Sequence, residues 1–138
     1  LEGDEFHSLA NIAKMRAGIP LTDADRRPWL DAIAGHLAAW HASGMSGLVT
    51  CSALKQQYRA RLVAHCPEAR FIYLKGTPDL IRERLVKRLG HFMPVNLLDS
   101  QFAALEEPGP EERAVAVSAV PTPAEIVAEI LKLIPSFA

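Results

Sequence analysis

Two kinds of hydrophobic pattern alternate along this chain of 138 residues. In one kind, apolar residues recur every three or four positions, the spacing that places them on one face of a helix. In the other, short apolar runs with β-branched residues are bounded by turn residues, which indicates buried strands. The alternation predicts an α/β fold with three layers, in which helices cover both faces of a parallel sheet.

Three apolar runs are predicted to be strands of this sheet. Their sequences are GLVTC at 47–51, RFIYL at 70–74 and AVAV at 114–117. Binding sites in such folds lie at the carboxyl ends of the strands. The segments after the first two runs, CSALK at 51–55 and KGT at 75–77, are therefore candidate site loops.

Helices are predicted where a capping residue precedes an amphipathic stripe. Ser8 is expected to cap a short helix that ends at about Ala17. Thr22 and Asp25 have the spacing of a capping box, and Pro28 is expected to interrupt or restart the helix that follows them. Further helices are expected at about 54–66, 77–90, 94–106 and 122–134.

Composition narrows the class of protein. The 15 Lys and Arg residues are balanced by 16 Asp and Glu, for a net charge of -1, which excludes a strongly basic nucleic-acid-binding surface. No apolar run reaches the roughly 18 residues of a membrane span, so no membrane partner is expected. The two cysteines, Cys51 and Cys66, fit a reduced, cytoplasmic protein. Without a repeat or linker, the chain is expected to form one domain.

Two polar clusters lie near predicted strand ends. Glu2 and Asp4, with His7 close behind, could orient a hydroxyl or hold Mg²⁺ through water, or could form an ordinary solvated loop. Lys55 and Arg59, one helical turn apart, could bind an anion or could be a solvated basic face.

A third cluster is the basic segment 82–91. Arg84, Arg88 and His91 share one side of its predicted helix. Their charge could stabilise a transferring phosphoryl group. The alternative is a basic helix end, where cations also suit the helix dipole.

Three segments together resemble the gluconokinase family of small-molecule kinases. They are 11–30, with NIAKM, GIPLTD and DRRPWL; 51–59, with CSALK and YR; and 90–108, with GHFMP, SQF and LEEP. The resemblance implies a P-loop NTPase fold of the nucleoside- or shikimate-kinase type. It implies Mg²⁺-assisted transfer of the γ-phosphoryl group of ATP to the 6-hydroxyl of D-gluconate. It also implies one kinase domain over 1–138, with a substrate-binding segment at about 8–30 and a LID at about 84–102.

On the acceptor side, the resemblance assigns the attacking hydroxyl to Asp4, which would orient and deprotonate it. Glu2 stands where Asp is usual and is linked to Mg²⁺ only indirectly. His7 is in register with a substrate-binding position, and His91 is expected in a closing loop beside the substrate.

Four cations are candidates for the gluconate carboxylate: Lys14, Arg26, Lys55 and Arg59. Arg59 is favoured because a guanidinium can bind a carboxylate through two hydrogen bonds.

On the nucleotide side, the resemblance implies that Arg84 and Arg88 contact ATP when the LID closes, with a catalytic role for Arg88. Pro121, in the loop after the last predicted strand, would lie beside the adenine.

The phosphate-binding loop of such kinases, G-x-x-x-x-G-K-[ST], does not occur in these residues. The resemblance puts it before Leu1, so we expect roughly 30 further residues there, forming a strand, the loop and a helix. Two alternatives stay open: a kinase of the same fold for another acceptor such as shikimate, and a non-catalytic truncated fragment. The resemblance is compatible with a homodimer, to which exposed faces of Trp29 or Trp40 could contribute.

Overall fold

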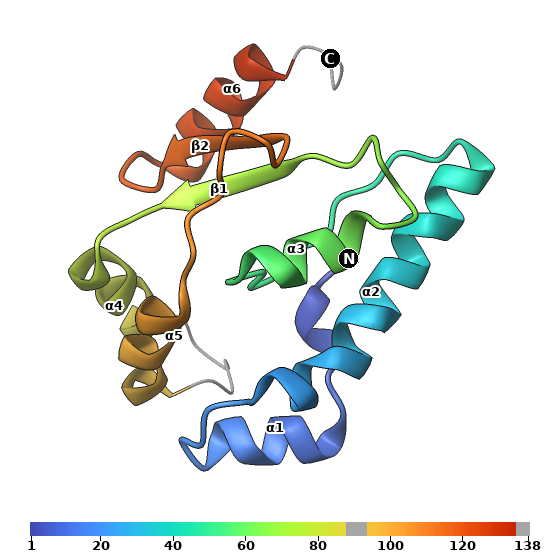
Figure 1. Ribbon diagram of the computed structural model, residues 1–138. Helices are drawn as coiled ribbons and strands as arrows, with labels where there is room; N and C mark the ends of the chain where they lie inside the picture. Colours follow the sequence, from blue (N-terminus) through green and yellow to red (C-terminus); the bar gives the residue numbers. More distant parts are fainter. Residues whose placement is uncertain (88–93, 135–138) are drawn as a thin grey trace. The chain divides into compact units, whose positions relative to one another are not determined.

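A computed structural model of the protein describes residues 1–87 and 94–134 (Figure 1). Their contacts divide them into two compact units: unit 1 comprises 1–69 and 94–107, and unit 2 comprises 70–87 and 108–134. In chain order the elements are η1 (Gly3–Phe6), α1 (Leu9–Arg16), α2 (Asp23–Ser43), α3 (Gln56–Val63), β1 (Phe71–Lys75), α4 (Pro78–Lys87), η2 (Val95–Leu97), α5 (Leu98–Ala104), β2 (Ala114–Ser118) and α6 (Pro123–Leu133), where η denotes a 3-10 helix.

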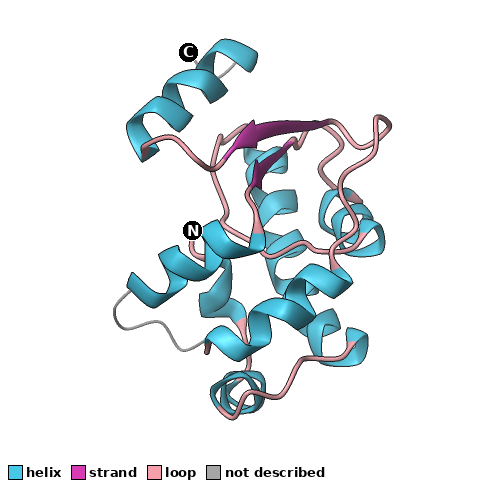
Figure 2. Cartoon of the chain, turned by 90° about the vertical axis from the view of Figure 1, so that its left-hand side faces the viewer, coloured by secondary structure: helices cyan, strands magenta, loops and turns pink. Residues whose placement is uncertain are grey.

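Unit 2 contains two of the predicted strands. β1 and β2 pair in parallel, with Tyr73 opposite Ala116, and Figure 2 shows them side by side. α4 begins directly after β1, where the Thr77 hydroxyl accepts a hydrogen bond from the backbone N–H of Leu80 at 3.3 Å. The predictions of an α/β fold, parallel pairing and strands near 70–74 and 114–117 are confirmed.

The predicted strand at 47–51 is wrong, since the sheet in the described residues consists of β1 and β2. The end of this run does pair in parallel with the start of the chain in unit 1. The Thr50 N–H donates to the Leu1 carbonyl at 3.0 Å, and the Gly3 N–H donates to the Thr50 carbonyl at 2.8 Å. So few residues meet that the pairing amounts to one parallel bridge, between Glu2 and Thr50.

The predicted interruption at Pro28 is also wrong, because α2 continues through it. Thr22 and Asp25 form both hydrogen bonds of the capping box. Proline removes one backbone donor from a helix and costs about 3 kcal/mol in its interior. Burial of the next two side chains, Trp29 and Leu30, offsets this cost because each large apolar side chain contributes about 1.5–3 kcal/mol.

The predicted helix at 94–106 is a 3-10 turn, η2, followed by the shorter α5. Leu97 of η2 packs with Met15 and Leu21 in a buried cluster of unit 1. Beside it, Asn96 approaches Gly18 so closely that a Cβ on this glycine would lie 2.7 Å from the amide nitrogen. Residues 95–97 are therefore fixed against the loop between α1 and α2.

The two tryptophans of α2 differ in burial. Trp29 is 1% exposed and belongs to the core, so it offers no exposed face to a second subunit. Trp40 is half-buried and covers Gly47, where a Cβ would lie 2.4 Å from the indole ring. No helix in the described ranges is long and apolar enough to cross a membrane.

Candidate active site

Asp4 lies on η1, immediately after the paired start of the chain. Gly3 makes this turn feasible, since a Cβ there would lie 2.1 Å from the Thr50 carbonyl oxygen. The indole N–H of Trp29 donates to the Gly3 carbonyl at 2.7 Å and holds the turn against α2. The half-buried Asp4 is therefore held directly after the parallel bridge between Glu2 and Thr50.

His7 ends the turn and is buried, with 8% of its surface exposed. Its ring stacks on Trp29, with centroids 4.4 Å apart and planes 12° from parallel. Burial lowers the pKa of His7; the charge of Asp4 opposes this effect and that of Arg26 adds to it. The imidazole is therefore neutral near pH 7. Its Nδ1 is buried and has no hydrogen-bond partner among the described residues.

Arg26, on α2, is 6% exposed. Its guanidinium carbon lies 5.9 Å from the centre of the Tyr58 ring, at the outer limit of a cation–π contact. In the part of the chain that the structure describes, its side chain makes no hydrogen bond or ion pair. A guanidinium has five N–H donors and is seldom buried without an acceptor. Arg26 is thus a buried cation well suited to receive a carboxylate.

Cys51 shares the surroundings of Asp4 and Arg26. Burial raises the pKa of its thiol to about 12; Asp4 adds to this rise and Arg26 opposes it. Cys51 is therefore protonated near neutral pH, which argues against a nucleophilic role. Asp4 and Arg26 thus both lie near enough to Cys51 to affect its pKa.

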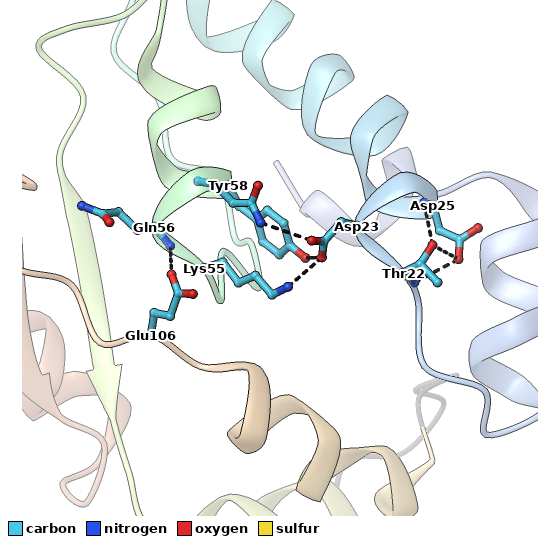
Figure 3. Close-up of polar contacts among 8 residues, drawn as sticks. Thr22, Asp23, Asp25, Lys55, Gln56, Tyr58 and Glu106 are labelled. Atoms are coloured by element: carbon cyan, nitrogen blue, oxygen red, sulfur yellow. Dashed lines mark hydrogen bonds and ion pairs between the residues drawn. The ribbon is translucent and has the colours of Figure 1, made fainter.

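Lys55 and Tyr58 meet at Asp23, the first residue of α2 (Figure 3). The Lys55 ammonium lies 2.8 Å from Asp23 Oδ1, to which the Tyr58 hydroxyl also donates. Gln57 donates to the other carboxylate oxygen at 3.2 Å. Hydrogen bonds from Lys55 and then from Tyr58 lower the pKa of Asp23. This carboxylate therefore links the start of α2 to that of α3.

Lys14 is paired with Asp25, the second acidic residue in the first turn of α2. Its ammonium lies 2.7 Å from Asp25 Oδ1, while the backbone N–H and hydroxyl of Thr22 donate to Oδ2 at 3.0 and 2.8 Å. Lys14, followed by Thr22, lowers the pKa of Asp25 to about 2. Of the four predicted carboxylate ligands, Lys14 and Lys55 are thus already neutralised by aspartates.

Arg59, the favoured carboxylate ligand, binds the chain's own backbone. It is 3% exposed, and its Nη1 donates to the carbonyls of Ala53 and Leu54 at 2.9 and 3.2 Å. These bonds hold the predicted site loop that leads to Lys55. The structure therefore gives Arg59 a role in shaping the loop.

The remaining predicted residues are dispersed. Glu2 is exposed and accepts a hydrogen bond from the Thr50 hydroxyl at 3.0 Å. Within the described ranges, no three His, Cys, Asp or Glu side chains are grouped so that they could hold a metal ion. In unit 2, Arg84 donates to the Pro121 carbonyl at 3.3 Å, a long hydrogen bond that brings two predicted nucleotide contacts together. Arg88 and His91 lie outside the described residues.

Sequence reasoning missed three side chains that order this region: Asp23, Tyr58 and Glu106. Asp23 and Tyr58 are 35 positions apart, and Glu106 contacts Gln56 across 50 positions. Spacing along one helix could not reveal either contact. The one signal for the three was their place in the quoted motifs: Asp23 in GIPLTD, Tyr58 in YR and Glu106 in LEEP.

Solved structures with the same fold identify the class of protein. An unliganded sugar kinase from Janibacter sp. HTCC2649 is 42% identical, with a TM-score of 0.91 over 98% of this chain and 78% of that one. A gluconokinase from Sinorhizobium meliloti 1021 is 45% identical, with a TM-score of 0.86 over 100% of this chain and 77% of that one. The fold is that of a sugar kinase. No protein-family model matches the chain.

Curated relatives identify the family. The thermoresistant gluconokinase of Escherichia coli K12 is 43% identical over 135 residues, which are 97% of this chain and 77% of that protein. The gluconokinase of Gluconobacter oxydans 621H is 40% identical over 131 residues, 95% of this chain and 74% of that one. The chain belongs to the gluconokinase family.

Proposed function

We propose that this protein phosphorylates D-gluconate at its 6-hydroxyl with ATP, to give 6-phosphogluconate and ADP. The observation that carries this proposal is the 43% identity to a gluconokinase over 97% of the chain. The local chemistry supports it, because a carboxylate, a neutral imidazole and a buried guanidinium act in one region of unit 1. A sugar acid offers hydroxyls to the first two groups and a carboxylate to the third.

Asp4 is the residue that we assign to the attacking hydroxyl. Its carboxylate can accept the proton of that hydroxyl as the new oxygen–phosphorus bond forms and the bond between the γ-phosphorus and the ADP oxygen breaks. The fixed turn behind it favours this role, because Gly3 is held by both Thr50 and Trp29.

For the gluconate carboxylate we assign Arg26 as the main ligand. A carboxylate would supply the acceptors that this buried guanidinium lacks among the described residues, through two charge-assisted hydrogen bonds. Lys55 is a second ligand, because an ammonium has three N–H donors and Asp23 Oδ1 accepts only one of them. His7 is assigned to a substrate hydroxyl, in keeping with its unpaired Nδ1. Lys14 and Arg59 remain proposed ligands of lower rank.

The proposed contacts to ATP and Mg²⁺ are supported by membership of the family. Mg²⁺ neutralises phosphate charge in such reactions and is commonly bound through the nucleotide phosphates and water rather than by a cage of side chains. The scattered carboxylates of the described residues fit that mode, with Glu2 at most an indirect contact. Arg84, Arg88 and Pro121 are proposed for ATP, on a P-loop NTPase fold. A homodimer and a cytoplasmic location are further predictions.

The test is gluconate-dependent formation of ADP by the full-length protein, with shikimate and a nucleoside monophosphate as competing acceptors. Asp4→Asn is expected to lower kcat by about 100-fold or more, since it removes a proton acceptor. Glu5→Gln is the matched control, because it neutralises an exposed carboxylate on the same turn and should leave kcat unchanged. Turnover with another acceptor but not gluconate would overturn the proposed substrate, and full activity of Asp4→Asn would overturn the role of Asp4.

A further inference from the structure

The loop that carries Lys55 is held from two directions. From α3, Arg59 binds the carbonyls of Ala53 and Leu54. From the segment after α5, the backbone N–H of Glu106 donates to the same Leu54 carbonyl at 2.8 Å. Two parts of the chain therefore converge on the residue just before Lys55.

The side chain of Glu106 fixes the residue just after Lys55. Its Oε2 accepts a hydrogen bond from the backbone N–H of Gln56, the first residue of α3, at 2.7 Å (Figure 3). Lys55 is the N-cap of this helix and makes no side-chain capping bond. Glu106 supplies an acceptor in its place, and its negative charge suits the N-terminal end of the helix dipole.

The segment that bears Glu106 is anchored at its other end as well. Leu97 is buried against Met15 and Leu21, and Asn96 packs on Gly18. Residues 95–106 therefore span between the α1–α2 loop and the Lys55 loop within unit 1. They brace the loop that joins the helices of Lys14 and Arg26, and the loop that carries Lys55.

We propose that Glu106 is a positioning residue for gluconate binding, which acts by holding Lys55 in place. The backbone is bonded to Glu106 on both sides of Lys55, and this fixes the origin of a long, flexible side chain whose ammonium reaches Asp23 at 2.8 Å. Without the Glu106 carboxylate, the first turn of α3 loses its cap and Lys55 samples more positions. This change weakens gluconate binding and leaves phosphoryl transfer to the hydroxyl unaffected. The inference rests on the proposed function.

The experiment compares steady-state gluconate kinetics and thermal unfolding of full-length variants. Glu106→Ala is expected to raise the KM for gluconate about fivefold or more while kcat changes by less than about twofold. Glu106→Gln keeps an acceptor oxygen and should restore much of the lost affinity. Glu125→Ala is the matched control, because Glu125 also accepts a backbone N–H at the start of a helix, α6 in unit 2. It should lower the Tm comparably and leave the KM unchanged.

A double variant tests whether Glu106 acts through Lys55. Once Lys55→Met has removed the ammonium, adding Glu106→Ala should raise the KM by less than about twofold more. If the KM of the double variant rose by the product of the two single-variant increases, the proposal would be overturned. An unchanged KM in a folded Glu106→Ala protein would overturn it as well. Absence of gluconate turnover in the unaltered protein would instead overturn the proposed function itself, and the inference with it.

Discussion

Trp29 donates its indole N–H to the carbonyl oxygen of Gly3 at 2.7 Å, while its ring stacks on His7 at 4.4 Å. One buried side chain of α2 thus contacts both ends of the turn that carries Asp4. The position of the proposed proton acceptor depends on the packing of a helix from a different part of the sequence.

Trp29→Phe should therefore damage both stability and turnover. Phenylalanine retains an aromatic ring beside His7 but leaves the buried Gly3 carbonyl without its donor, at a cost of about 1–3 kcal/mol. Urea unfolding would measure this cost, and kcat should fall because the Asp4 turn loosens. Trp40→Phe is the control in the same helix, since Trp40 is only half-buried and its indole N–H has no hydrogen bond among the described residues. Equal losses in the two variants would argue against the role of the Trp29 bond.

Gly3→Ala and Gly35→Ala should have effects of opposite sign. A Cβ at Gly3 would lie 2.1 Å from a backbone oxygen of Thr50, so the pairing of the two segments must open. Gly35 lies within α2 and has no atom within 4 Å of its ideal Cβ, so alanine there should stabilise the helix by about 1 kcal/mol. Thermal unfolding of the two variants checks the prediction, and a stable, active Gly3→Ala protein would contradict it.

The parts of the fold that sequence predicted well are set by local chemistry. The capping box predicted at Thr22 forms, the last helix lies within the predicted range 122–134, and the strand predicted at 70–74 is shifted by only one residue in β1. Local rules failed where distant contacts decide the outcome. Pro28 is tolerated because the helix that contains it buries a large apolar face, and the run at 47–51 pairs too briefly to form a strand.

In the candidate site, too, residues set by local sequence differ from those set by distant contacts. Asp4 and His7 were proposed from the family resemblance, and in the structure they share one short turn, with Asp4 on η1 and His7 at its end. Among the four cations, sequence reasoning favoured Arg59 for its chemistry alone, because it had no view of distant partners: Asp23, for example, pairs with Lys55 across 32 positions. That Arg26 is 6% exposed and makes no hydrogen bond with another described residue is visible only once the surrounding helices are packed.

That ranking predicts opposite behaviour for two buried arginines. Arg26→Met removes a charge that lacks a hydrogen-bonded partner among the described residues, so the Tm should hold or rise. The same variant should raise the KM for gluconate by about 10- to 100-fold, which corresponds to the loss of one charge-assisted hydrogen bond. Arg59→Met should lower the Tm sharply, because the carbonyls of Ala53 and Leu54 lose their donor. If Arg59→Met stayed stable but lost gluconate affinity, Arg59 would be the carboxylate ligand.

The ion pair between Lys14 and Asp25 at the start of α2 should make the free energy of unfolding depend on pH in the acid range. Asp25 has a pKa of about 2 in the folded protein, below its ordinary value of 3.8, first because of Lys14 and then because of Thr22. Since the folded pKa is the lower one, the unfolded chain binds the proton more readily. The stabilisation is therefore complete above pH 3.8 and is lost as the pH falls from there through about 2.

Urea midpoints measured from about pH 5 to about pH 2 would reveal this loss as a slope set by proton uptake. Asp25→Asn should flatten the slope, since an amide does not titrate. Lys14→Met removes the largest cause of the shift, so the folded pKa of Asp25 should move back toward 3.8 and its contribution should shrink across the whole window. Identical slopes in all three proteins would show that Asp25 is not held in this ion pair in solution. Lys14 would then be available to a bound carboxylate.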